Sequence, residues 1–81
     1  MSKIRIVRIP RSFASIGISK QWLGAEMPFQ KKNIDGDFEV LSQDAIAALR
    51  LLGREEAASY WEKAILQEKV TFAEEFCDII D

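Results

Sequence analysis

Five oxygen-bearing side chains in the middle of the chain have the spacing of a calcium-binding loop. Asn33, Asp35, Asp37, Glu39 and Asp44 occupy positions 1, 3, 5, 7 and 12 of a twelve-residue window, and these are ligand positions of an EF-hand loop. That loop needs glycine at position 6 for its sharp turn, whereas this window has glycine at position 4 and phenylalanine at position 6. We therefore predict a polar hairpin turn here and no metal site.

Catalytic chemistry is argued against by what the chain lacks. It contains no histidine, which removes the commonest general base, Ser-His and Cys-His nucleophile pairs, and every metal set that includes histidine. The single cysteine, Cys77, has no cation beside it in the sequence, so we expect a buried structural thiol. No phosphate-binding glycine motif is present. We predict a protein that is not an enzyme and needs no cofactor.

Trp22, Met27 and Phe29 lie in an apolar segment, residues 15–33, that is broken by two glycines and a proline. The segment is predicted to form two helical turns and an extended arm that crosses from a first strand to a second. Because aromatic side chains at helical spacing are usually buried, one interpretation is that the core includes Phe13, Ile16, Trp22 and Leu23. The alternative is that Trp22, Met27 and Phe29 are exposed on the arm and anchor a partner protein.

Charge is distributed unevenly along the chain, although the net charge is only −2. Residues 1–33 carry seven basic residues and one acidic residue, a net charge of +6. Residues 34–53 carry one basic and four acidic residues (−3), and residues 54–81 carry three basic and eight acidic residues (−5). Glu74, Glu75 and Asp78 crowd a predicted final helix, at whose negative end Asp78 is unfavourable by about 0.3–1 kcal/mol. Stability does not explain that placement, so we predict that these three acids bind a cationic partner surface. The alternative is that they solubilise the terminus or pair with the basic strand.

The elements expected to position these residues form one α+β domain that spans residues 1–81. Residues 3–9 alternate well enough for a strand, and an Asp-Gly turn leads into a second strand near residues 38–41. Apolar side chains at helical spacing predict helices over about residues 43–52, with Ser42 as N-cap, and 54–69, with Gly53 between them. Thr71 and Glu74 form a capping box ahead of a third helix, with a strand at residues 69–72 as the alternative. The predicted fold is a small two-stranded antiparallel sheet with an irregular arm, packed against three C-terminal helices.

The apolar positions of these elements predict a common core. Its expected members are Ile4, Ile6, Val40, Leu49, Leu52, Trp61 and Ile65.

The stretch IRIVRIPRSFASIGIS, residues 4–19, resembles a pattern in AbrB/MazE-type antitoxins and transition-state regulators. In that family a strand runs into Ile-Pro-Arg or Ile-Pro-Lys, a short helix and a glycine flanked by aliphatic residues. GDFEV, from Gly36, resembles the family's Gly-Asp-x-Val strand, and the resemblance covers about half of the chain. It implies a swapped-hairpin dimer that binds DNA through basic residues such as Arg5, Arg8 and Arg11, with an acidic C-terminal part that holds a toxin.

Two functions are consistent with these observations. The first is a small protein-binding module, such as an inhibitor, an antitoxin-like regulator or a phage-type anti-defence protein, which acts by occupying a partner's surface. The alternative is a DNA-binding regulator that uses the basic N-terminal strand, with homodimerisation left open in both cases. Since the apolar runs are far shorter than the roughly 20 residues that span a bilayer, we expect a cytoplasmic protein without membrane contact.

Overall fold

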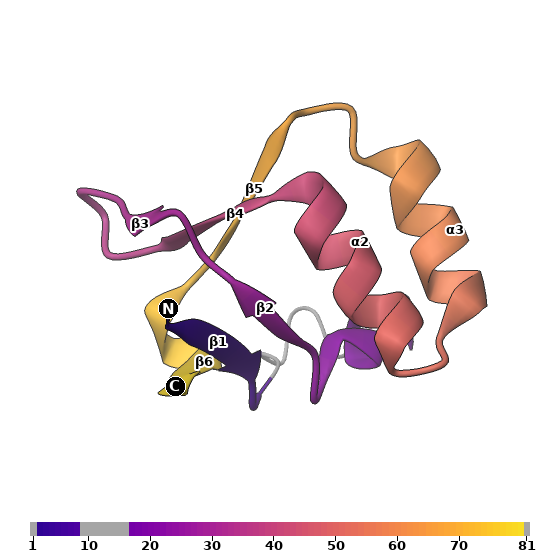
Figure 1. The fold of residues 1–81 in the computed structure, drawn as a ribbon, viewed down its shortest axis with the longest axis horizontal. Coiled ribbons are helices and arrows are strands. Elements are labelled where there is room, and N and C mark those ends of the chain that lie inside the picture. Colours follow the sequence, from indigo (N-terminus) through magenta and orange to yellow (C-terminus); the bar gives the residue numbers. More distant parts are fainter. Residues whose placement is uncertain (1, 9–16, 81) are drawn as a thin grey trace.

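Strand β1 (Lys3–Ile6) is the centre of one of two antiparallel sheets in the computed structural model, which describes residues 2–8 and 17–80 (Figure 1). Its two isoleucines alternate with Lys3 and Arg5, and this period of two places Ile4 and Ile6 in the core. β1 pairs with β2 (Glu26–Pro28) on one side and with β6 (Cys77–Ile80) on the other. Segments from near both ends of the sequence therefore lie side by side in this sheet.

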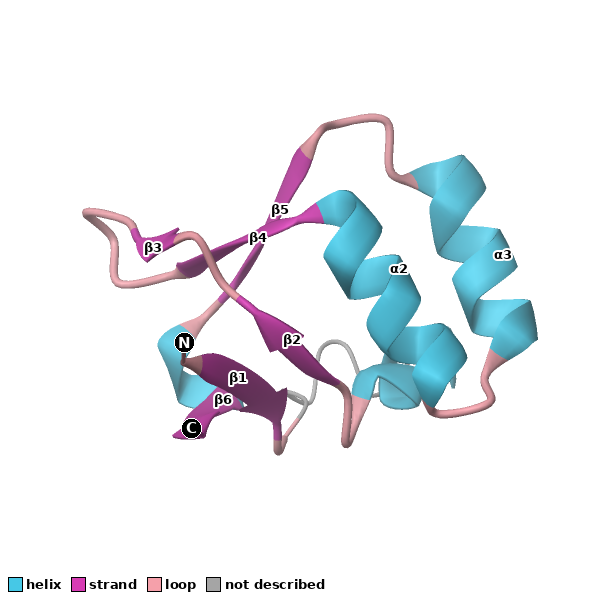
Figure 2. Ribbon diagram, in the orientation of Figure 1, coloured by secondary structure: helices cyan, strands magenta, loops and turns pink. Residues whose placement is uncertain are grey.

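The second sheet is built around β4 (Phe38–Leu41), which lies between β3 (Lys31–Lys32) and β5 (Lys69–Phe72). The polar turn predicted from the Asp-Gly pair joins β3 to β4. In the register of β4 with β5, Phe38 is opposite Phe72 and Val40 is opposite Val70. Helices α2 (Ser42–Leu51) and α3 (Glu55–Ala64) lie side by side at one end of the molecule (Figure 2). Two 3₁₀ helices complete the described elements, η1 (Gly17–Trp22) and η2 (Glu74–Phe76).

The α+β class agrees with the sequence, but the predicted two-stranded sheet with three C-terminal helices is wrong. The described residues form two three-stranded sheets and two α-helices. The predicted third helix is replaced by β5, η2 and β6, and part of the predicted arm forms β2 and β3. Val70 and Phe72 have the period of a strand and pair with buried residues of β4, and this tertiary pairing outweighs the local capping signal. The alternative of a strand at residues 69–72 is the one confirmed.

The helical hairpin follows the sequence pattern with corrections at its ends. α2 begins at Ser42 instead of after it, because the Ser42 hydroxyl donates to the Gln67 carbonyl (2.6 Å) and caps no helical N–H. Gly53 ends the turn after α2 with φ of 77°, a left-handed conformation that favours glycine. The second predicted helix, over residues 54–69, is shorter in the structure and ends at Ala64.

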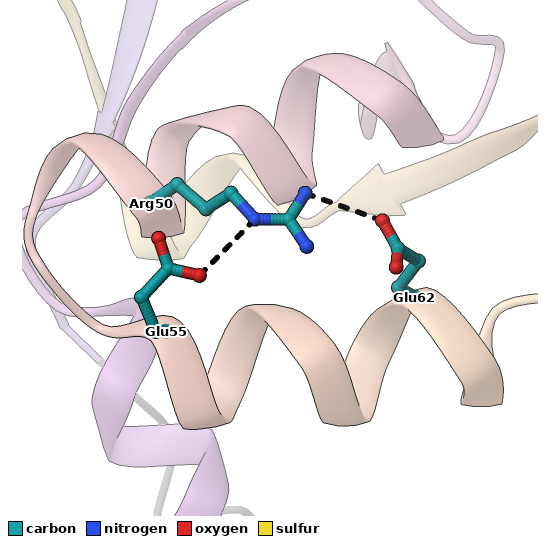
Figure 3. A network of polar contacts seen from close by, with 3 residues as sticks. All are labelled: Arg50, Glu55 and Glu62. Atoms are coloured by element: carbon teal, nitrogen blue, oxygen red, sulfur yellow. Dashed lines mark hydrogen bonds and ion pairs between the residues drawn. The ribbon is translucent and has the colours of Figure 1, made fainter.

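One arginine joins the two helices. Arg50 Nε of α2 lies 3.3 Å from Glu55 Oε2, and its Nη1 lies 3.2 Å from Glu62 Oε2, both carboxylates being on α3 (Figure 3). Its hydrogen bond and charge interaction with Glu62, and then those with Glu55, raise the pKa of the guanidinium. These groups are exposed, so the network contributes little to stability.

The core combines both sheets with the inner faces of the helices. The predicted core residues Ile4, Ile6, Val40 and Leu49 are buried. The prediction is wrong for Leu52, since this residue lies past the end of α2 and is 40% exposed. Trp61 and Ile65 are only half-buried, because two small residues of α3, Ala57 and Ala58, make its fully buried surface. The remaining buried apolar residues are Trp22, Ala25, Met27, Phe38, Ala45, Ile46, Ala48 and Cys77.

No helix among the described residues is both long enough and apolar enough to cross a membrane.

Candidate functional site

An open hollow of about 410 Å³ lies between the β3–β4 turn and the chain that follows β5. It is lined by Asp35, Gly36, Asp37, Ala73, Glu74 and Glu75, and we refer to these six residues as the acidic hollow. The two walls are far apart in the sequence and are brought together by the pairing of β4 with β5.

The first wall is a turn organised by Asn33. Its side-chain oxygen accepts hydrogen bonds from the backbone N–H groups of Asp35 (3.0 Å) and Asp37 (2.9 Å). The Gly36 N–H donates to the Asn33 carbonyl (3.0 Å), and Gly36 has a φ of 87°. A Cβ at Gly36 would lie 3.5 Å from Glu74 Oε2, so the turn approaches the second wall closely. The polar turn therefore fixes two carboxylate-bearing residues at the rim of the acidic hollow.

The second wall is the start of η2, which is bonded to β3 and to the two residues that follow β1. The Arg8 guanidinium donates to the backbone carbonyl of Glu75, and the Val7 N–H donates to the Phe76 carbonyl (2.8 Å). Lys32 Nζ of β3 lies 2.8 Å from Glu74 Oε1. These contacts hold the wall in place and neutralise one of its two carboxylates.

The electrostatic character of the acidic hollow follows from its remaining acids. Among the described residues, Asp35, Asp37 and Glu75 have no ion-pair partner, so three carboxylates share a concave surface without a cation from the described part of the chain. Clefts lined by one sign of charge focus the field and attract the opposite sign. No group of three or more His, Cys, Asp or Glu side chains in the described ranges has a geometry that could hold a metal ion. The acidic hollow is therefore a concave surface of negative charge.

The predicted acidic residues are divided between two places. Glu74 and Glu75 line the acidic hollow, whereas Asp78 lies on β6, opposite Arg5 of β1. Asp78 therefore does not sit at the end of a helix, and the dipole penalty predicted for it does not exist. Whether any of these acids binds a partner stays a prediction.

The aromatic and methionine side chains of the predicted arm belong to the core. Trp22 is 7% exposed and Met27 is fully buried, so neither presents an exposed anchor. Phe29 is half-buried, and its ring packs edge-on against Phe38 with 4.9 Å between centroids. The exposed-arm alternative is wrong for Trp22 and Met27, because η1 and β2 turn them inward.

The basic residues of the alternative DNA-binding hypothesis are engaged within the chain where they are described. Arg5 Nη2 lies 3.0 Å from Glu26 Oε2, and Arg8 is bonded to Glu75 as above. Arg11 lies outside the described residues.

Sequence reasoning missed the contribution of Asp35 and Asp37. Their spacing resembles that of a calcium-binding loop, and nothing local in the sequence connects them to residues 73–75. The alternation of Val70 and Phe72 was the available signal, because a strand there pairs with β4 and brings the following acids beside the turn.

Comparisons with known proteins give no relative. No protein-family model matches the chain, and neither a curated protein nor a solved structure matches it significantly. The resemblance to AbrB/MazE-type proteins therefore gains no support from these comparisons.

Proposed function

We propose that this protein is a small, non-catalytic protein-binding module that recognises a cationic surface on a partner protein. The observation that carries the proposal is the acidic hollow. There, segments from both sides of the β4–β5 pairing place on one concave surface three carboxylates that have no ion-pair partner among residues 2–8 and 17–80. Such a surface speeds encounter with a basic partner, and its effect weakens as salt increases. Binding would act by covering the partner's surface, as an inhibitor or regulator does.

The test starts with a pull-down that compares two variants as bait with the wild type. The double variant Asp35→Asn/Glu75→Gln removes from the acidic hollow two exposed charges for which the described part of the chain offers no ion-pair partner. The matched control, Glu56→Gln/Glu68→Gln, also removes two exposed charges without an ion-pair partner among the described residues, but lies outside the hollow. We expect the wild type and the control to pull down a basic protein that the hollow variant, Asp35→Asn/Glu75→Gln, does not pull down.

Association kinetics with that isolated protein then decide the matter. We expect the on-rate of the hollow variant to fall by about three- to tenfold at low salt and to lose most of its salt dependence, with the control unchanged. An unchanged on-rate in the hollow variant, with its circular dichroism spectrum intact, would contradict the proposal. A gel shift of mixed-sequence DNA that disappears on replacing Arg5 and Arg8 with Gln would instead support the DNA-binding alternative.

A further inference from the structure

β6 is an edge strand whose outer side has no partner among residues 2–8 and 17–80. In an antiparallel pair, alternate residues direct their N–H and C=O groups toward the partner strand. The bond from the Val7 N–H to the Phe76 carbonyl sets the phase, so Asp78 and Ile80 are bonded toward β1. The N–H and C=O of Ile79 consequently point to the open edge, where they can pair with another strand.

The inner face of the sheet continues as apolar surface to this edge. Ile79 is opposite Ile4 in the register, which places both side chains on the same face. Ile4 is fully buried, whereas Ile79 is 58% exposed. An apolar side chain on an added strand would cover Ile79.

The outer face of the sheet carries a row of alternating charges. Glu26 of β2, Arg5 of β1 and Asp78 of β6 are direct cross-strand neighbours. The Arg5 guanidinium is paired with Glu26, and Asp78 has no ion-pair partner among the described residues. A strand added at β6 would place its own residue directly opposite Asp78, where a cation is favoured and a second acid is not.

We propose that the open edge of β6 binds an extended segment of the partner protein as a fourth strand. The segment has alternating side chains, with a lysine or arginine opposite Asp78 and an apolar residue beside Ile79. This inference rests on the proposed function and specifies the kind of partner segment that the module takes. A second copy of this chain fits less well, since its β6 would bring further carboxylates to the edge.

The probe is a synthetic six-residue peptide, acetyl-Thr-Lys-Val-Arg-Val-Thr-amide, and its control has glutamate in place of both basic residues. Amide hydrogen exchange is followed for each residue by NMR. In the free protein we expect the Ile79 amide to exchange at least tenfold faster than those of Asp78 and Ile80. Saturating basic peptide should slow Ile79 exchange by tenfold or more, and the acidic peptide should leave it unchanged.

A charge swap tests the pairing itself. Asp78→Lys should weaken binding of the basic peptide by at least tenfold and should create binding of the acidic peptide. Asp78→Asn should weaken binding of the basic peptide without creating binding of the acidic peptide. Unchanged affinity of the basic peptide for Asp78→Lys, or no slowing of Ile79 exchange, would overturn the inference. A dimer in sedimentation whose Ile79 amide is protected without peptide would also overturn it, because the occupant would be a second copy.

The hollow variant separates this inference from the proposed function. In one outcome the basic peptide binds the wild type without changing Ile79 exchange, and Asp35→Asn/Glu75→Gln no longer binds the peptide. The edge inference then fails and the proposed function stands. If the peptide protects Ile79 but association of the isolated partner is indifferent to the hollow variant, recognition by the acidic hollow fails and the edge inference stands.

Discussion

Phe38 offers the sharpest test of the fold, because its side chain connects the two sheets' common core to the segment that carries the acidic hollow. It is 2% exposed and lies opposite Phe72 on β5. Its ring packs against that of Phe29, and Lys32 Nζ lies 5.5 Å from its centroid. Replacing it with alanine removes these contacts and leaves a cavity under β4.

The expected cost is a large part of the protein's stability. Removing a buried phenylalanine side chain costs about 3–5 kcal/mol, and a domain of this length has a free energy of unfolding of about 4–12 kcal/mol. Phe38→Ala should therefore unfold at a much lower urea concentration than the wild type, whereas Phe38→Leu should lose only about 1 kcal/mol. Trp61→Ala provides a comparison, since that half-buried residue should cost less than Phe38.

Urea denaturation followed by circular dichroism measures all three variants. The order of the losses is the decisive result, with Phe38→Ala the largest. A loss below about 1 kcal/mol for Phe38→Ala would refute the assignment of β4 to the core. If Trp61→Ala loses as much stability as Phe38→Ala, or more, the conclusion that α3 contributes to the core mainly through its two buried alanines would be refuted.

Three further perturbations have defined outcomes. Gly36→Ala should destabilise by about 1–2 kcal/mol because of its positive φ, and Gly36→Asn should cost less; equal losses in urea denaturation would argue against the turn. Arg50→Gln should lower the melting temperature slightly at low salt and leave it unchanged at high salt. A fall in melting temperature that does not depend on salt would contradict the exposed network. Burial, and then the charge of Asp78, raise the pKa of the Cys77 thiol to about 11 from 9.0. As pH rises, the thiol of the unfolded chain loses its proton first, so the stabilisation of the folded state by the protonated thiol is complete below pH 9 and is lost as pH rises toward 11. The melting temperature of the wild type relative to that of Cys77→Ala should therefore fall over that range. A constant difference between the two melting temperatures would contradict the raised pKa.

Local signals in the sequence predicted the elements whose causes are local. The alternation around Ile4 and Ile6 predicted β1, the Asp-Gly pair predicted the β3–β4 turn, and Gly53 predicted the break between the two helices. Each of these depends on neighbours within a few residues, through side-chain period or glycine's positive φ.

The strands that were missed either pair with a distant strand or are very short. β6 pairs with β1 across more than seventy residues of sequence, and β2 and β3 have only three and two residues. Segments so short carry too few positions for a period to be recognised, and the Thr71–Glu74 capping box gave a competing local signal. The candidate site was therefore half visible, since Glu74 and Glu75 stood out by charge while Asp35 and Asp37 needed the pairing of β4 with β5.

Asp78 shows how a corrected fold changes the reason for a functional hypothesis. On a helix its charge was unexplained by stability, whereas on β6 it is the third member of the row that begins with Glu26 and Arg5. The Arg5 guanidinium, which lies between the two acids, is paired with Glu26 at 3.0 Å and not with Asp78. Glu26→Gln, two strands from the open edge, should free Arg5 to pair with Asp78 and should weaken binding of the basic peptide several-fold.

The control for this prediction is Glu39→Gln, which also breaks one ion pair, with Lys69 at 3.9 Å, but in the other sheet. Both variants remove one carboxylate, so a general loss of negative charge would weaken the peptide equally in the two. A selective loss in Glu26→Gln, measured by fluorescence anisotropy at low salt, means that the state of Arg5 controls the charge presented at the edge. Equal affinities of Glu26→Gln and wild type would show that Asp78 does not take part in binding through this row, and the alternation of charges across the sheet would then have only a structural role.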